Sequence, residues 1–87
     1  IYLAPYHGEA HLLLGRMHLR ARRIDDAIDA FTISIWSQDT TAARVALAEA
    51  YLEAGEAEMA RVEVEIVLAR EPAHPDARRL LARVGQR

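Results

Sequence analysis

The chain has 87 residues, of which 52% are hydrophobic and 28% are charged, and none is cysteine. Eleven basic and thirteen acidic side chains leave a net charge of -2, which excludes a basic surface for nucleic acid or anionic lipid. The lack of cysteine excludes disulfides and the usual structural zinc sites, and charges interrupt every apolar run before the roughly 20 residues that span a bilayer. We expect a small soluble domain without membrane insertion, in a compartment that the sequence leaves open.

Two helices are predicted before residue 40, because apolar residues recur there at spacings of three and four. The first helix carries one apolar face, made of Ala10, Leu13, Leu14, Met17 and His18. The second carries another, made of Ile24, Ala27, Ile28, Phe31 and Ile35. Asp25 and Asp26 lie at the start of the second helix, where negative charge is favourable.

Three more helices follow. One is expected from about Thr41 to Ala54 and the next from about Ala57 to Arg70, and a fifth opens with Pro75, a residue favoured in the first turn. Connections of about three to five residues force neighbouring helices to run antiparallel. No segment has the alternating pattern of a strand, so the chain is predicted to be all-α.

The sequence repeats itself with a period of 33 or 34 residues. Leu14 and Gly15 return as Leu47 and Ala48 and again as Leu81 and Ala82, and other positions keep the same phase: Ala10, Ala43 and Ala77; Ala27 and Ala60; Phe31 and Val64; Pro5 and Pro72. A period of this length indicates an architecture of stacked repeats.

The second repeat resembles the tetratricopeptide repeat, a helix-turn-helix unit of 34 residues. Six of its positions agree with that family's pattern: Leu47, Ala48, Tyr51, Gly55, Ala60 and Pro72. The first repeat keeps Leu14, Gly15, Ala27 and Phe31 but has His11 for the usual tryptophan, His18 for tyrosine and Arg22 for the turn glycine. The resemblance implies antiparallel helix-turn-helix repeats stacked as a short right-handed α-solenoid of about five helices.

On this reading residues 1–87 form a single domain cut from a longer repeat protein, and the richness in Ala and Arg hints at a bacterial source. Residues 1–7 are expected to end a preceding repeat, 8–40 and 41–74 to be two complete repeats, and 75–87 a closing helix. Small residues should let paired helices approach closely, and larger ones should fill the space between them. The small set is Gly15, Ala27, Ala48 and Ala60, and the large set is Leu14, Phe31, Leu47 and Tyr51.

Candidate chemistry is sparse. His7, His11 and His18 share one helical stripe, which could present imidazoles to a metal, but His11 and His18 occupy positions of core aromatics. Packing with one ring nitrogen hydrogen-bonded is therefore the preferred interpretation. The acidic residues Asp25, Asp26 and Asp29 are interpreted as a helix start with solvated pairs to Arg22 and Arg23. We expect no catalytic residues, no metal and no cofactor.

Trp36, the only tryptophan, should face the convex side together with Asp25, Asp29 and Thr32. Two roles remain open for it, an interface with a partner and packing on the next helix or loop.

The resemblance implies that the first helix of each repeat lines a concave surface, where residues one period apart stand side by side. Two rows alternate in charge: Arg16, Glu49 and Arg83, and Arg20, Glu53 and Arg87. Either these rows fix the register of the repeats by ion pairs, or they form the walls of a groove whose floor is Leu12, Leu19, Val45 and Leu52. The partner-binding candidates are accordingly Leu12, Arg16, Leu19, Arg20, Val45, Glu49, Leu52, Glu53 and Arg83.

The expected function is a protein–protein interaction or scaffold module that presents this surface to a protein or peptide. The alternatives are a structural spacer without a separate ligand and an accessory region of a larger enzyme. Family members that clamp the carboxylate of a chaperone tail use cations on this face. One cation, Arg16, is left among the matching positions, which are Leu12, Arg16, Ala46, Asp76 and Leu80, so that partner is disfavoured.

A homodimer of the fragment is a further expectation. Ile1, Tyr2 and Leu3 resemble the end of a helix without its partner, with Leu12, Leu13 and Trp36 nearby. The opposite end is polar, with Arg78, Arg79, Arg83, Gln86 and Arg87.

Overall fold

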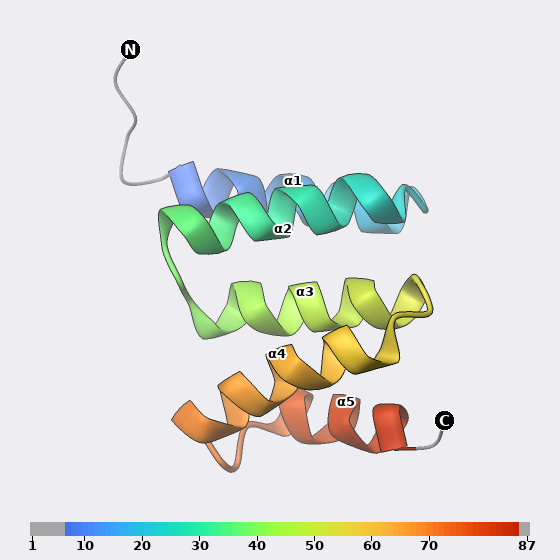
Figure 1. Ribbon diagram of the computed structural model, residues 1–87. Helices are drawn as coiled ribbons and strands as arrows, with labels where there is room; N and C mark the ends of the chain where they lie inside the picture. Colours follow the sequence, from blue (N-terminus) through green and yellow to red (C-terminus); the bar gives the residue numbers. More distant parts are fainter. Residues whose placement is uncertain (1–6, 86–87) are drawn as a thin grey trace.

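The computed structural model describes residues 7–85, which form five helices joined by short turns (Figure 1). In chain order they are α1 (His7–Arg20), α2 (Ile24–Ser37), α3 (Thr41–Glu53), α4 (Ala57–Arg70) and α5 (Pro75–Gly85). No strand occurs within this described range, so the predicted all-α helical repeat is confirmed. The fourth helix has the predicted bounds, the third ends one residue earlier than expected, and the fifth begins at Pro75 as predicted.

The helices form two layers. Helix α3 contacts both α1 and α5, whereas α2 and α4, over their described lengths, do not touch each other. The first helices of the successive pairs therefore make one face, and the second helices make the other. Within residues 7–85 no helix is long and apolar enough to cross a membrane.

Each helix pair turns through a residue with positive φ. In the second turn Gly55 has a φ of 81°, and in the first turn Arg22 has a φ of 67°. Glycine adopts this conformation without steric penalty, whereas an L-residue with a Cβ is strained by it. Arg22 thus occupies the turn position that the repeat pattern assigns to glycine. The backbone of the first pair is therefore strained at this turn, whereas that of the second pair is not.

The first pair packs closely because position 15 has no side chain. A methyl group at Gly15 would overlap the ring of Phe31, which is fully buried against it. Ala27, Ala48 and Ala60 are also fully buried, so the prediction that small residues allow close approach is confirmed. The expectation that Leu14 fills the space between the helices is wrong, since Leu14 is exposed.

Two local contacts fix the helix ends. The Ser34 hydroxyl, buried at the end of α2, donates a hydrogen bond of 2.6 Å to the Gly8 carbonyl at the start of α1. Thr40 caps α3, because its Oγ1 accepts a hydrogen bond of 3.1 Å from the Ala43 amide.

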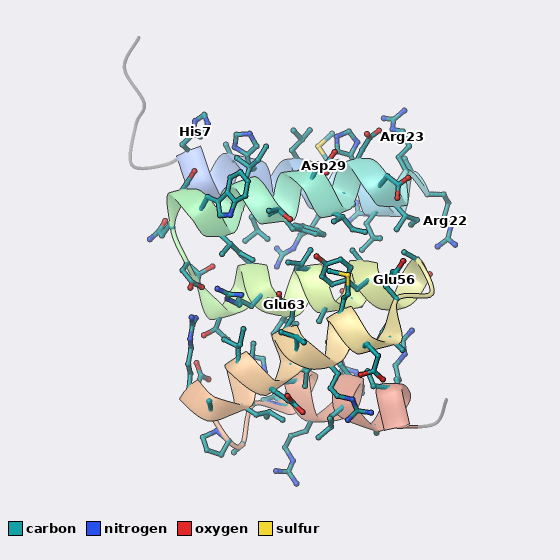
Figure 2. The ribbon with its side chains drawn as sticks, viewed as in Figure 1. His7, Arg22, Arg23, Asp29, Glu56 and Glu63 are labelled. Atoms are coloured by element: carbon teal, nitrogen blue, oxygen red, sulfur yellow. The ribbon has the colours of Figure 1, made fainter. Side chains whose placement is uncertain are left out.

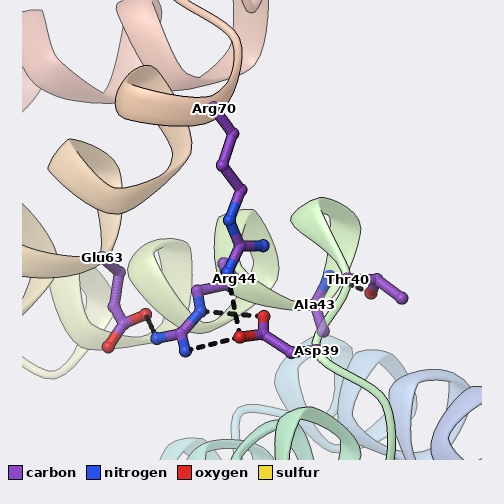
Figure 3. A network of polar contacts seen from close by, with 6 residues as sticks. All are labelled: Asp39, Thr40, Ala43, Arg44, Glu63 and Arg70. Carbon is purple, nitrogen blue, oxygen red and sulfur yellow. Dashed lines mark hydrogen bonds and ion pairs between the residues drawn. The ribbon is translucent and has the colours of Figure 1, made fainter.

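A charged network, named here the Asp39 network, links the α2–α3 connection to both helices of the second pair (Figure 3). Both carboxylate oxygens of Asp39 accept from Arg44, at 3.0 and 2.9 Å, and one also accepts from Arg70 at 2.9 Å. Arg44 donates a further bond of 2.8 Å to Glu63. These charge-assisted hydrogen bonds hold the pKa of Asp39 well below its usual range and raise that of Arg44, because each charged form is stabilised by its partner.

Candidate partner-binding surface

A hollow of about 260 Å³, the concave hollow, lies on the face built from α1, α3 and α5. Its apolar floor includes Leu19 from α1 and Val45 from α3. Arg16 and Glu49 stand at its wall, and the far side is formed by the α4–α5 connection and the start of α5. The lining residues are Arg16, Leu19, Phe31, Thr41, Ala42, Val45, Ala46, Glu49, Glu71, His74 and Asp76. Side chains from three stacked helices thus converge on one concave space.

A second, more open hollow of about 300 Å³ continues the first along α1, lined by Arg16, Leu19, Arg20 and Glu49. Three of its four lining residues also line the concave hollow. The two form one depression with an apolar base and charged edges, which is the general form of a surface that holds a peptide.

The structure brings five of the nine predicted surface residues to this depression: Arg16, Leu19, Arg20, Val45 and Glu49. The other four lie elsewhere. Leu12 lines a separate hollow between α1, the end of α2 and the start of α3, and Leu52 packs against the core formed by α3, α4 and α5. Glu53 and Arg83 are joined in an ion pair of 3.8 Å.

The predicted charge rows do not form as ion pairs. Glu49 makes no ion pair with Arg16, Arg83 or any other residue of the described range. Glu53 does pair with two cations, but they are Arg22 at 3.2 Å and Arg83 at 3.8 Å. Arg22 replaces Arg20 in this role because the positive-φ turn carries it toward the end of α3, and Figure 2 shows it extending from that turn. Arg87, the last member of the second row, lies outside the described residues.

Sequence reasoning missed the residues that close the far side of the concave hollow. Glu71 and His74 belong to the α4–α5 connection, and the path of a connection depends on how the helices pack. The signal available in the sequence was Pro72 and Pro75, which fix where the connection must turn. His74 also has a structural role, because its Nδ1 accepts a hydrogen bond from the Ala77 amide at the start of α5.

The hollow has an excess of negative charge. Asp76 is paired with Arg79 at 2.8 Å, whereas Glu49 and Glu71 have no ion-pair partner among residues 7–85. Arg16 is the one cation among the lining residues.

The histidines of α1 do not assemble a metal site. His11 Nδ1 lies 3.0 Å from the His7 carbonyl, which confirms a hydrogen-bonded ring nitrogen for His11. His18 Nδ1 differs from the expectation, since it is buried without a hydrogen-bond partner in the described structure. Over the same range no three potential ligands among His, Asp and Glu come together.

The acidic residues at the start of α2 are solvent-exposed. Asp25 and Asp26 lie in the first turn as predicted, but the expected ion pairs with Arg22 and Arg23 are wrong, because Arg22 pairs with Glu53.

Trp36 is 80% exposed near the end of α2. Little of its side chain is therefore covered by the described structure, which disfavours the packing role, and an interface role stays a prediction.

The repeat assignment has independent support from comparison with known proteins. A family model described as tetratricopeptide repeat matches residues 32–84, more than half of the chain. Neither the curated proteins nor the solved structures give a significant match.

Proposed function

This chain belongs to the tetratricopeptide repeat family, and from that premise we propose that it binds a peptide or protein segment in the concave hollow. Repeats of this family generally mediate protein–protein interaction or scaffolding and are generally not enzymes. A stack of such repeats displays an extended curved surface made of rigid helices. The division of the chain into the segments 1–7, 8–40, 41–74 and 75–87 is part of this proposal, and residues 1–6, the bulk of its first segment, lie outside the described residues.

The observation that carries the proposal is the convergence of α1, α3 and α5 on one space with an apolar base. Leu19 and Val45 offer apolar surface that is only partly covered by the chain itself. Burial of such surface supplies about 25 cal/mol per Å² before the costs of association are subtracted. An apolar side chain of a partner segment, seated over Leu19 and Val45, would provide the central contact.

The charged side chains around the concave hollow favour some partner segments over others. Glu49 and Glu71 face the concave hollow without an ion-pair partner in the described structure. Arg16 is the one cation in the lining of this hollow, and Arg20 lines the adjoining one. A basic side chain beside the apolar one would therefore be attracted, and an acidic tail would be repelled. The proposed partner is an apolar segment with at least one Lys or Arg.

Selection from a random displayed-peptide library tests the proposal. The 87-residue chain is the bait, and each selected peptide is then measured against two variants. Val45→Glu places a charge on the floor of the hollow, and Met59→Glu places the same charge on the exposed outer side of α4 as a matched control. We expect selected peptides to combine apolar and basic residues, to lose at least tenfold in affinity on Val45→Glu, and to keep it on Met59→Glu.

Two outcomes would reject the proposal. Peptides that bind Val45→Glu as well as the natural chain would place the interaction elsewhere on the molecule. A library that yields no binding peptide at all would favour the structural-spacer alternative, in which the hollow has no ligand.

A further inference from the structure

The outer side of α2 carries an exposed stripe that is apolar at one end and acidic at the other, named here the α2 stripe. Trp36 is 80% exposed and Ile33 36%. Asp29, Asp26 and Asp25 continue the line toward the start of the helix, and all three are exposed. Successive spacings of three or four residues place these side chains on one side of a helix. An exposed tryptophan grouped with a second apolar side chain is typical of a surface that binds a partner.

The repeat architecture does not account for the α2 stripe. One period later α4 has neither the tryptophan nor the acids, and the residues equivalent to positions 36, 33, 29 and 26 are Ala69, Ile66, Val62 and Met59. Helix α4, like α2, contacts a first helix on each side, yet Val62 and Met59 remain exposed. Neighbouring helix pairs thus leave this side of a second helix open, and stacking does not dictate which residues occupy it.

The three carboxylates of the α2 stripe have no cationic partner among residues 7–85. Asp25 and Asp26 lie in the first turn of α2, where the partial positive charge of the helix end stabilises them. Asp29 lies beyond that turn, so the helix dipole does not explain its charge. A line of unpaired carboxylates attracts a cationic partner and repels an acidic one.

From this arrangement we infer that the α2 stripe docks an amphipathic helix of a partner protein, with apolar side chains at one end and Lys or Arg at the other. The apolar end covers Trp36 and Ile33. The cations lie over Asp29 and Asp26, about 10 to 15 Å from Trp36 at the helical rise of 1.5 Å per residue.

The stripe also dictates the order of residues in the docked helix. A matching helix has two apolar residues followed by two basic residues, at successive spacings of three, four and three. Basic residues are favoured near the C-terminal end of a helix by its dipole, so the docked helix runs antiparallel to α2.

The α2 stripe is separate from the concave hollow. None of its residues lines that hollow or its extension along α1. The inference is therefore independent of the proposed function, although both surfaces favour apolar and basic partners.

A second copy of the chain is a poor occupant of the α2 stripe. Its α5 is rich in arginine, but Arg79 is already paired with Asp76 and Arg83 with Glu53. No large apolar side chain of α5 is exposed beside these arginines. The charge of α5 thus fits the acidic end of the stripe, whereas its apolar surface does not fit the other end.

The homodimer expected from the sequence stays a prediction. Its N-terminal part, Ile1 to Leu3, lies outside the described residues, whereas Leu13 and Trp36 are exposed. A dimer that covers Trp36 would compete with the partner helix, so the test includes it as an outcome.

The fluorescence of Trp36 tests the inference, because the 87-residue chain has one tryptophan. The probe is a short peptide of alanine and glutamine that carries two leucines and then two lysines at spacings of three, four and three. A hydrocarbon cross-link on the opposite side of the peptide stabilises its helix, which is too short to persist alone in water. We expect a saturable shift of the emission to shorter wavelength, because the leucines cover the indole. The same peptide with glutamate for lysine should bind at least fivefold more weakly.

Variants of the full chain locate the contact. Asp29→Lys should weaken binding at least fivefold, and Asp26→Lys is the second variant if the first misfolds, as checked by circular dichroism. Val62→Lys is the matched control, because it places the same charge at the equivalent position of α4, which is 54% exposed. Val45→Glu, on the floor of the concave hollow, should leave the shift unchanged, so this test can fail while the proposed function holds.

Three results would overturn the inference. One is the absence of a saturable shift with the natural chain. Another is binding that is equal for the lysine and glutamate peptides or unchanged in both aspartate variants, since charge would then not select the partner. The third is an emission shift that follows protein concentration without peptide, together with a dimer in sedimentation, because a second copy would then occupy the stripe.

Discussion

The two helix pairs differ in length by one residue and share the positive-φ turn and the phase of the repeat, yet they are stabilised by different chemistry. In the first pair Gly15 faces the buried ring of Phe31, and in the second the corresponding residues are Ala48 and Val64. Compared with the second pair, the first pair lacks a methyl group on its first helix and has an aromatic ring on its second helix, so the facing volumes compensate. Between these two pairs, a smaller residue on one helix is thus accompanied by a larger residue on the facing helix.

Polar contacts differ in the same way. Arg44, Glu63 and Arg70 of the second pair correspond to His11, Ala30 and Ser37 in the first. The second pair thus has the Asp39 network, whereas the first has a hydrogen bond between Ser34 and Gly8 at the matching end. The second pair thus combines a smaller apolar contact with a charged network. The first pair combines a larger apolar contact with no such network.

The largest expected effect comes from removing the ring that distinguishes the first pair. Phe31→Ala should lower the free energy of unfolding by about 3–5 kcal/mol, because a fully buried aromatic side chain leaves a cavity. Val64→Ala is the matched change in the second pair and should cost less, about 1–3 kcal/mol, since fewer atoms are removed. Urea unfolding followed by circular dichroism measures both. Equal costs would contradict the contrast between the two pairs.

Exchanging the residues of one pair for those of the other sharpens the comparison. Gly15→Ala alone should cost about 1–3 kcal/mol, because the added methyl group overlaps the Phe31 ring. Adding Phe31→Val, which recreates the combination of Ala48 and Val64, should recover part of this loss. The double variant should then be more stable than the sum of the two single costs predicts, by about 1 kcal/mol in a double-mutant cycle. Additive costs would show that the facing volumes do not compensate.

The Asp39 network predicts that the stability of the protein depends on pH through the contacts of Asp39 with Arg44 and Arg70. The pKa of Asp39 is lowered in the folded protein, so its contribution is complete above its ordinary pKa and is lost as the pH falls below about 4. Asp39→Asn should cost about 1 kcal/mol at pH 7, a modest amount because the carboxylate is partly exposed and screened by water.

The stability difference between the natural chain and Asp39→Asn should shrink when urea unfolding is repeated at progressively lower pH. A matched control is Asp29→Asn, which removes an exposed carboxylate that makes no ion pair with another described residue. A difference that persists undiminished at pH 2.5 would refute the electrostatic origin of the Asp39 contribution.

The smallest effect concerns the two turns. Arg22→Gly should raise stability by up to about 1 kcal/mol, because glycine adopts the positive φ at position 22 without strain. Gly55→Ala should lower it by about 1 kcal/mol, and there the cost is confined to the backbone, since a Cβ at position 55 would meet no neighbour.

Arg22→Gly also removes the ion pair with Glu53, which a second variant accounts for. Glu53→Gln breaks that pair without altering the turn and should change stability by less than about 1 kcal/mol. Thermal unfolding of the three variants separates the two contributions, and a destabilised Arg22→Gly beside a neutral Glu53→Gln would show that the positive φ at position 22 carries no strain.

The helices and their phase could be predicted from the sequence because a repeat presents the same pattern of small and large residues more than once. Gly15 and Phe31 were placed correctly for this reason. The burial of Leu14 was not, because its equivalent Leu47 is covered by a preceding helix pair, and a single repeat does not specify its neighbour. Helical phase placed Leu19 and Val45 on the face where the depression lies, but it missed Glu71 and His74, which reach the hollow through a connection.

Ion-pair partners were the least predictable feature. Helical phase paired Glu53 with Arg20 and Arg87, but the long side chain of Arg22 reaches the same carboxylate from a turn. The Asp39 network escaped sequence reasoning because Asp39 precedes its helix and its partners lie 5 and 31 residues away. A charge on a flexible side chain can be satisfied from several directions, so spacing alone does not choose among them.

The position of the Asp39 network has a mechanical consequence. The connection between the two helix pairs is short, and Asp39 ties it to α3 through Arg44 and to the end of α4 through Arg70. The tilt of one pair against the next determines how strongly a repeat array curves, and this joint is where that tilt is set. Two of the four charged side chains, Asp39 and Arg70, are more than one-third exposed, so ionic strength should alter the stiffness of the joint. The curvature of the array would then change with salt concentration, and the width of any groove along its inner side would change with it.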